Sequence, residues 1–388
     1  MEDVNHQPTN AVASRIEENS AAFLGAVLDR LHTADALAHL YLPGQSDRTH
    51  VSLCSSLSTL ISTVADRKNV DRVVLREAES LATDYRRFGM TPEFYLLFSS
   101  IIQEELRKLC TDLSFEEVFH AERAVEIVFR DMAETTRRLD LAGVPASTGA
   151  TVAEVERRSR RFSVVRLVAD RPLDYRPGQY MAVTADFLPN VWRFLCPSIP
   201  PNQWGQVEFH VQSDADSIAT LLASTQPGDR WRIGNGLGNL SDNAIESGAE
   251  LLLVGFATGL APLRSIMLEI VNRPNPPRVH FFVGAEYPGE LYELMGLWNF
   301  AAACPWLSVV PVVTHEIDEW WVQATEASRP PRGLHLVQVG SLADAVTSYG
   351  TWSDREVLIA GPAEKTEGVR DAMIARGTPP GSIRCLSF

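Results

Sequence analysis

Hydrophobic positions recur at helical spacing through the first third of the chain. Between about Ala13 and Asp140, apolar residues follow one another three or four positions apart in several stripes, which is the pattern of helices with one buried face. Strand-like alternation is absent from this part of the sequence. The pattern predicts an all-helical domain over residues 1–145, and a run rich in glycine, proline and small residues predicts a linker over 141–151.

The hydrophobic pattern changes after the linker. Short runs rich in β-branched and aromatic residues, separated by proline and glycine turns, are typical of strands. They lie at 162–168, 180–184 and 207–211, with a brief helical stretch at 218–223. This pattern predicts a small antiparallel β-barrel domain over residues 152–245.

From residue 246 onward, apolar runs alternate with helical stretches. Strands are predicted at 251–254, 279–283, 308–313, 335–339 and 356–360, and helices at 262–272, 290–302, 341–349 and 364–376. Such alternation predicts an α/β domain with a doubly wound parallel sheet over residues 246–388. Ligands of these sheets bind beyond the carboxyl ends of the strands.

One predicted turn from strand to helix carries candidate chemistry. Leu251–Val254 reads as a strand buried on both faces, Gly255, Thr258 and Gly259 follow it, and Pro262 stands in the first turn of the next helix. Such a turn lets a diphosphate approach backbone N–H groups at a helix N-terminus. The alternative is an ordinary turn, because short glycine motifs also occur without a ligand.

Composition and charge narrow the class of protein. The 388 residues are 45% hydrophobic and 22% charged, as in folded globular proteins, and the formal net charge is -14. That acidity argues against nucleic acid or an anionic membrane as a partner. The chain also has no long apolar run and no signal sequence at its polar start, and its 5 cysteines are scattered. We therefore expect a cytoplasmic protein with free thiols and no cysteine-bound cluster.

The domain order and four motifs resemble those of the flavohaemoglobins, whose last two domains belong to the ferredoxin–NADP reductase superfamily. The motifs are the turn 176–180, the glycine turn 254–262 with Phe256 where glycine is usual, the run 358–362 with Ala360 in place of a cysteine, and the chain end 383–388. The resemblance covers nearly the whole chain. It implies a globin-like domain, an FAD-binding barrel and an NAD(P)-binding domain.

The resemblance implies a set of flavin contacts in which several donors are replaced. The family run Arg-x-Tyr-Ser/Thr is here Arg193-Phe194-Leu195-Cys196. Arg193 can still bind a diphosphate through two bonds, but Leu195 has no hydroxyl and Cys196 is a weak donor. The implied flavin-binding residues are Tyr180, Arg193, Phe194, Leu195, Cys196, Ser217 and Phe388, of which Cys196 and Phe388 are the candidate catalytic residues.

For the nicotinamide nucleotide, the resemblance implies residues that follow the predicted strands. They are Gly255, Thr258, Gly259, Pro262, Glu286, Gly361 and Pro362. A carboxylate at Glu286 would accept hydrogen bonds from a ribose 2′-hydroxyl and repel a 2′-phosphate. We therefore expect NADH to be used in preference to NADPH, with a solvated loop charge as the alternative role for Glu286.

The helical domain departs from the family at its haem site. Residues 82–95 resemble the proximal haem segment, and Tyr85 stands where the family has the histidine that binds iron. The other matching positions are Leu28, Leu42 and Leu53 on the distal side, and Tyr95 and Glu134 on the proximal side. A pocket filled by leucine favours a haem-free globin fold. We expect no metal ligand, unless haem binds and Tyr85 coordinates its iron.

The combined patterns imply an NAD(P)H-dependent flavin oxidoreductase, which passes electrons from NADH through FAD to an unidentified acceptor such as a protein. Two alternatives stay open. One is a nitric oxide dioxygenase with haem bound by Tyr85, and the other is a non-catalytic sensing or binding module derived from a flavohaemoglobin.

Overall fold

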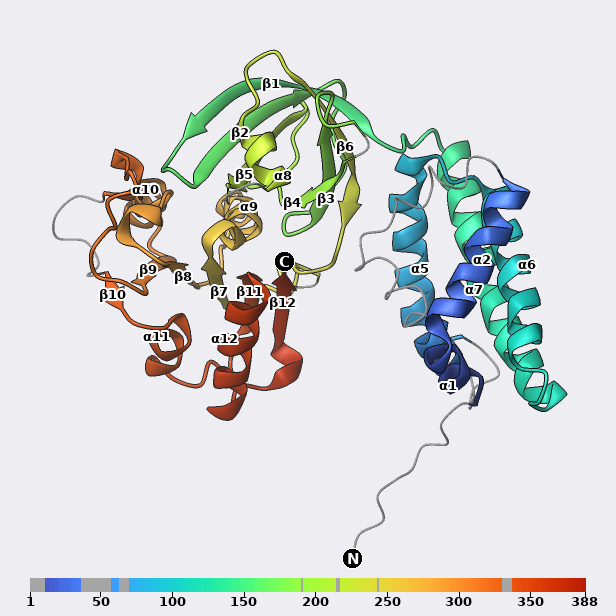
Figure 1. The fold of residues 1–388 in the computed structure, drawn as a ribbon. Helices are drawn as coiled ribbons and strands as arrows, with labels where there is room; N and C mark the ends of the chain where they lie inside the picture. Colours follow the sequence, from blue (N-terminus) through green and yellow to red (C-terminus); the bar gives the residue numbers. More distant parts are fainter. Residues whose placement is uncertain are drawn as a thin grey trace, which may run out of the picture. The chain divides into compact units, whose positions relative to one another are not determined.

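The computed structural model describes residues 11–35, 57–62, 70–189, 191–213, 217–242, 244–329 and 337–388. Two compact units make up the chain, residues 1–146 and residues 147–388. In Figure 1 the helical unit runs from blue to teal and the second unit from green to red. Among the described residues, no helix combines the length and the apolar character that a bilayer-spanning segment needs.

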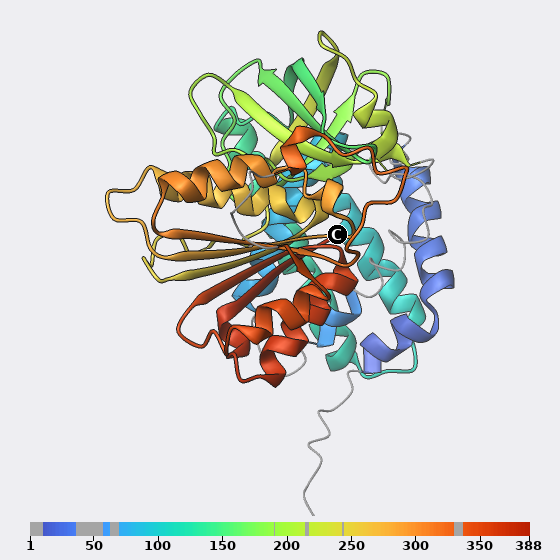
Figure 2. The same cartoon turned by 90° about the vertical axis from the view of Figure 1, so that its left-hand side faces the viewer.

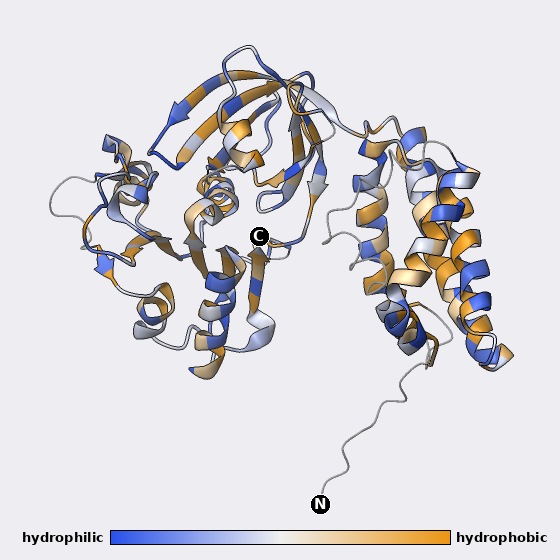
Figure 3. Cartoon of the chain, viewed as in Figure 1, coloured by the Kyte–Doolittle hydropathy of each residue, from blue (hydrophilic) through white to orange (hydrophobic). Residues whose placement is uncertain are grey.

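The first unit is helical, as the sequence predicts. Its long elements are α1 (Ala11–Glu18), α2 (Ser20–Ala34), α5 (Arg72–Tyr85), α6 (Pro92–Leu109) and α7 (Phe115–Leu141). Apolar faces of these helices meet in one core, which Figure 3 shows as orange stretches along them. Local chemistry fixes the start of α6, because the Thr91 side chain accepts a hydrogen bond from the Phe94 N–H and Pro92 occupies the first turn.

The predicted linker is partly wrong. Helix α7 continues to Leu141, and strand β1 (Thr148–Arg157) begins inside the expected linker. The first residues of β1 pair antiparallel with strand β6 (Arg230–Leu237), from Thr148 opposite Ile233 onward. Glycine and alanine have low strand propensity, so the sequence Thr-Gly-Ala-Thr gives little sign of the pairing.

The second unit begins with a six-stranded antiparallel sheet in the order β4-β3-β6-β1-β2-β5. Besides β1 and β6 it contains β2 (Phe162–Ala169), β3 (Tyr180–Ala185), β4 (Arg193–Leu195) and β5 (Gln206–Gln212). The sheet curls around a core that includes the stacked rings of Phe209 and Trp231. The predicted β2, β3 and β5 are confirmed, as is helix α8 (Ile218–Ala223), whereas β1, β4 and β6 were not predicted.

A six-stranded parallel sheet follows, in the order β10-β9-β8-β7-β11-β12. Its strands are β7 (Leu251–Phe256), β8 (Val279–Ala285), β9 (Leu307–Val313), β10 (Gln338–Val339), β11 (Glu356–Gly361) and β12 (Ile383–Ser387). Its helices are α9 (Leu260–Val271), α10 (Leu294–Ala303), α11 (Leu342–Ser348) and α12 (Ala363–Ala375). Figure 2 shows α9 and α10 on one face and α11 and α12 on the other, so the doubly wound arrangement is confirmed.

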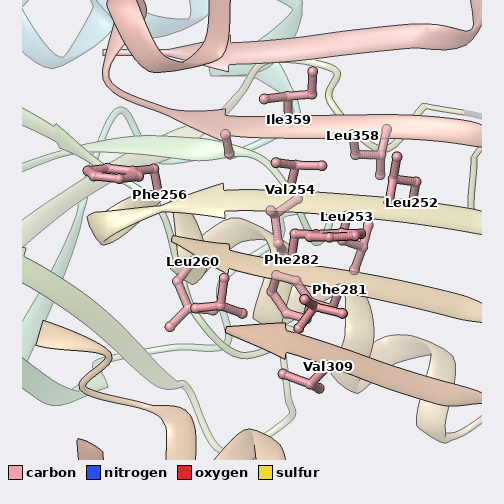
Figure 4. Close-up of a cluster of buried hydrophobic side chains, with 14 of the residues drawn as sticks. Leu252, Leu253, Val254, Phe256, Leu260, Phe281, Phe282, Val309, Leu358 and Ile359 are labelled. Carbon is pink, nitrogen blue, oxygen red and sulfur yellow. The ribbon is translucent and has the colours of Figure 1, made fainter. Parts of the chain in front are cut away.

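The parallel sheet is buried on both faces. Leu253 and Val254 from β7 pack beside Phe281 and Phe282 from β8, and Figure 4 shows these side chains with Ile359 of β11. Two differences from the sequence prediction concern ends of elements. The helix expected from 290 begins at Leu294, because residues 288–290 form a 3₁₀ turn, and the chain end forms the additional strand β12.

Candidate functional site

A cavity of ≈ 220 Å³ lies at the carboxyl ends of β7, β8 and β11. From β7 the strand order runs to β8 on one side and to β11 on the other, so this edge is the topological switch point where doubly wound sheets bind ligands. The cavity lining combines barrel residues with the turns that follow the three strands. It includes Arg161, Phe162, Phe256, Ala257, Glu286, Glu290, Pro362 and Lys365.

The predicted glycine turn packs against the end of β11. A Cβ atom built on Gly259 would collide with the carbonyl oxygen of Ala360, and Gly361 has a φ of +152°, with the Phe256 carbonyl 3.0 Å from its hypothetical Cβ. Both positions therefore require glycine. Pro262 is buried in the first turn of α9, as predicted, and Thr258 is half-buried beside it.

Two residues of this turn have side chains that occupy space which a glycine at the same position would leave open. The Phe256 ring is buried over Gly284, whose hypothetical Cβ would lie 2.7 Å from the ring. Ala257 has a φ of 52°, a left-handed conformation that costs an L-residue about 1–2 kcal/mol. Both residues line the cavity, so a ligand meets their side chains there as well as backbone N–H groups.

Two ion pairs border the cavity. Lys365 Nζ lies 3.2 Å from Glu286 Oε1 and 4.9 Å from the centroid of the Phe256 ring. Arg161 binds Glu290 through two bonds, from Nε to Oε1 at 2.7 Å and from Nη2 to Oε2 at 3.0 Å. Burial raises the pKa of Glu290, although Arg161 acts in the opposite direction. Of these four residues, only Glu286 was a predicted site residue.

A buried network behind the cavity connects the barrel to the parallel sheet. Glu208 on β5 accepts hydrogen bonds from Ser198 Oγ at 2.6 Å, Arg166 Nε at 2.7 Å and Arg264 Nη1 at 2.9 Å. Burial alone would raise the pKa of Glu208, but its contacts with His210, Arg264 and Ser198 hold that pKa well below the usual range. The carboxylate is therefore ionised at neutral pH and pairs with two arginines.

The network continues to the glycine turn through an aromatic residue. His210 Nδ1 lies 3.0 Å from the hydroxyl oxygen of Tyr292, which donates a longer hydrogen bond, 3.4 Å, to the carbonyl of Ala257. The Tyr292 ring stacks on Phe162 with 4.6 Å between centroids. The sequence contains a signal for this network, because Glu208 and His210 alternate with the apolar residues of β5 and so share one face of the strand, but this signal was missed.

The barrel brings several predicted flavin residues together. Strands β3 and β4 are neighbours, and the Tyr180 and Phe194 rings meet edge to face with 5.2 Å between centroids. Phe194 and Arg193 are exposed, and Leu195 is half-buried. An exposed aromatic surface beside an exposed guanidinium fits a planar ring that carries a diphosphate.

Three other predicted flavin residues have additional roles. Cys196 is half-buried, and burial raises the pKa of its thiol to about 12, so the thiol stays neutral. Ser217 Oγ accepts a hydrogen bond from the Thr220 N–H and so caps α8, a role that the sequence analysis did not assign to it. Phe388 is exposed, and its N–H donates to the Gly361 carbonyl at 3.2 Å, which fixes the chain end beside the turn after β11.

Comparison with known proteins identifies relatives of similar sequence. No family model matches the chain. The reductase component of phenol 2-monooxygenase from a Pseudomonas species is 27% identical over 155 residues, which is 39% of this chain and 43% of that protein. The reductase component of propane 2-monooxygenase from Rhodococcus jostii is 25% identical over 253 residues, 63% of this chain and 64% of that protein. The matches thus span less than two thirds of either relative.

A solved structure matches nearly the whole length. The flavohaemoglobin from Malassezia yamatoensis, with bound FAD and haem, is 13% identical with a TM-score of 0.68, covering 97% of this chain and 98% of that one. The chain has the flavohaemoglobin fold. Its second unit, residues 147–388, has the fold of a ferredoxin reductase, since the ferredoxin reductase of a carbazole 1,9a-dioxygenase covers 62% of this chain with a TM-score of 0.52 at 21% identity.

In the globin-like unit, Tyr85 lies at the end of α5 among charged residues. It is half-buried, and its ring centroid lies 6.1 Å from that of Phe88. Asp84 and Arg87 form a buried ion pair of 2.9 Å on either side of it. Burial raises the pKa of Tyr85, and the Asp84 charge adds to this shift, so the phenol is less easily converted to the phenolate that would bind iron.

The other predicted haem positions differ in their surroundings. Tyr95 is buried, but Glu134 is exposed on α7 and pairs with Arg137 at 3.3 Å. Leu28 is half-buried on α2. Leu42 and Leu53 lie outside the described residues. The described side chains therefore offer a ligand with a raised pKa and a carboxylate directed to solvent, which is a poor fit to haem.

Proposed function

We propose that this protein is an NAD(P)H-dependent flavin oxidoreductase that takes electrons from NADH through FAD and passes them to a separate acceptor. The observation that carries the proposal is the cavity at the switch point, bordered by the turns that follow β7, β8 and β11 and by barrel residues. The relatives named above are reductase components of oxygenases, which supports a redox protein as the acceptor.

The chain's own residues bind and orient the two cofactors. When bound, FAD and the nicotinamide supply the hydride chemistry. Tyr180 and Phe194 would support the flavin ring, and Arg193 would hold its diphosphate through two charge-assisted bonds. Gly259 and Gly361 keep the turns close enough together for the nucleotide to reach the cavity. Phe388 would cover the flavin ring and would have to move aside for the nicotinamide, while the neutral Cys196 thiol could act as a weak donor.

Glu286 supports a preference for NADH. Its carboxylate can accept a bond from a ribose hydroxyl and repels a 2′-phosphate. The nearby Lys365 offsets part of this charge, so we expect a modest preference, about tenfold in kcat/KM. Equal kcat/KM values for NADH and NADPH would contradict this role.

We further propose that the globin-like unit is haem-free. The support comes from the buried Asp84–Arg87 ion pair, the raised pKa of Tyr85 and the exposure of Glu134. Inserting a porphyrin beside Tyr85 would disturb a buried ion pair, and separating the partners of such a pair costs about 3–5 kcal/mol.

The absorption spectrum of the purified full-length protein tests both parts of the proposal. Protein expressed with ample haem supply should show flavin bands, should have no Soret band, and should oxidise NADH in the presence of an artificial dye. A Soret band that disappears in Tyr85→Phe would establish Tyr85 as a haem ligand and support the nitric oxide dioxygenase alternative. A colourless protein that does not oxidise NADH after FAD is added would support a non-catalytic module.

A further inference from the structure

Lys365 is a cation of the cavity to which the proposed function assigns no contact with a ligand. It lies in the first turn of α12, directly after the Gly361-Pro362 turn, and lines the cavity. Its ammonium group stands between the Glu286 carboxylate and the Phe256 ring. A nicotinamide nucleotide brings a diphosphate to this edge of the sheet, so a cation here has an obvious counter-charge.

The turn after β7 gives a specific reason for such a cation. A glycine-rich turn binds a diphosphate through backbone N–H groups, which requires the backbone to be accessible. Here Phe256 and Ala257 place side chains against the cavity at the start of that turn. The backbone contribution to anion binding is thereby reduced, and a side-chain cation can replace it.

Exposure distinguishes the two cations of the cavity. Glu290 has only 1% of its side chain exposed, so releasing Arg161 would leave a carboxylate buried without its partner, which is costly. The Lys365 and Glu286 side chains are 36% and 30% exposed, so water can solvate each of them when the pair opens. Arg161 is therefore held in place, whereas Lys365 can exchange its partner.

We propose that Lys365 binds the diphosphate of the nicotinamide nucleotide, and that Glu286 holds Lys365 until the nucleotide arrives. On binding, the ammonium group moves from Glu286 to a phosphate oxygen, and the Glu286 carboxylate is released toward a ribose hydroxyl. This exchange makes and breaks no covalent bond. The inference rests on the proposed nucleotide-binding function and assigns a residue to it.

The inference makes opposite predictions for the two members of the pair. Removing the charge of Lys365 should weaken binding, and removing the competing charge of Glu286 should strengthen it. Glu286→Gln keeps an oxygen acceptor for the ribose while it abolishes the ion pair. If Lys365 had only a structural role, both substitutions would change affinity little, or both would weaken binding through loss of stability.

The test is isothermal titration of the FAD-loaded full-length protein with NAD⁺ and, separately, with ADP-ribose, which has the diphosphate but no nicotinamide. Lys365→Met should raise the Kd for both ligands about tenfold, as expected for losing a partly solvated charge-assisted bond. Lys365→Arg should stay within about twofold of wild type, because it keeps the charge. Glu286→Gln should lower both Kd values about threefold.

Arg370→Met provides the matched control, because Arg370 lies on the same helix and pairs with an exposed carboxylate, that of Asp371. It should leave both Kd values unchanged. That result would show that the effect of Lys365→Met comes from a direct contact with the ligand and not from the loss of one positive charge on α12. A Lys365→Met variant that binds both ligands as wild type does would overturn the inference, as would one that loses affinity for NAD⁺ but not for ADP-ribose. Failure of the wild-type protein to bind either ligand would instead contradict the proposed function.

Discussion

Replacing Glu208 with glutamine tests whether the buried charge network stabilises the second unit, residues 147–388. Glu208 is 7% exposed, and Arg264 and Arg166 bind it at 2.9 Å and 2.7 Å. Losing one partner of a buried ion pair costs about 3–5 kcal/mol. In Glu208→Gln, Ser198 can still donate, and each arginine keeps another carboxylate, Glu293 or Glu154. We therefore expect a loss of about 2–3 kcal/mol in the free energy of unfolding.

Urea unfolding at pH 7, followed by tryptophan fluorescence, measures this loss. Trp231 is fully buried in the same barrel and reports its unfolding. Glu154→Gln is the matched control, because Glu154 binds the same Arg166 but has a side chain that is 59% exposed. It should cost less than about 0.5 kcal/mol. Equal costs for the two variants would refute the role assigned to burial.

The pH dependence gives the same argument a second readout. The folded-state pKa of Glu208 lies below its unfolded value of about 4.3, so its stabilisation is fully present above that pH and is lost as the pH falls toward the folded pKa. The stability difference between wild type and Glu208→Gln should be constant from pH 7 to about pH 5. Below about pH 4.3 it should shrink by about 1.4 kcal/mol per unit. A difference that grows on acidification would contradict this reasoning.

Four further outcomes are expected. Arg193→Ala should weaken FAD binding at least tenfold in fluorescence titrations, because the diphosphate loses two charge-assisted bonds. Ala257→Gly should raise the urea midpoint by relieving the left-handed alanine, a gain of up to about 1 kcal/mol. Burial raises the pKa of Asp84 to about 6, so the stability that this group contributes is greatest below its unfolded pKa and is lost as the pH rises through about 6. Urea titrations should therefore show the wild-type helical unit more stable at pH 5 than at pH 7. Asp84→Asn should remove that trend. Tyr85→His alone should give no Soret band when haem is added.

The sequence predicts an element well where local patterning and tertiary packing agree. Four apolar residues followed by a glycine turn identify β7 and the start of α9, because a strand buried on both faces has no polar positions. Strand β12 is different, since none of its five residues is fully buried and its order comes from pairing with β11. Pairing of that kind leaves no periodic signal in a five-residue run.

The residues of the candidate site also fall into some that the sequence predicts and some that it does not. Gly259 and Gly361 could be predicted, because each follows a predicted strand in a recognisable turn, although the backbone atoms that exclude a side chain there come from the other turn. The contacts of Arg161 could not, since Glu290 is 129 positions away and neither residue belongs to a local motif. The capping role of Ser217 was also missed, although a serine directly before a short helix is a recognisable cap. The family resemblance instead implies that this hydroxyl binds the flavin.

The departures from the resembling family have different consequences in the two units. In the reductase module, Phe256 and Ala257 alter the surface of the cavity, but the cavity keeps its position at the switch point, and Lys365 offers a nearby positive charge. In the globin-like unit, Asp84 and Arg87 place charges in the interior beside Tyr85. The loss of backbone contacts caused by a side chain at the edge of a cavity can be made good by one neighbouring charge. A buried ion pair, in contrast, must be separated or removed before a porphyrin can enter. On the proposed function, the changes around the cavity leave room for a nucleotide, whereas the buried charges beside Tyr85 oppose a porphyrin.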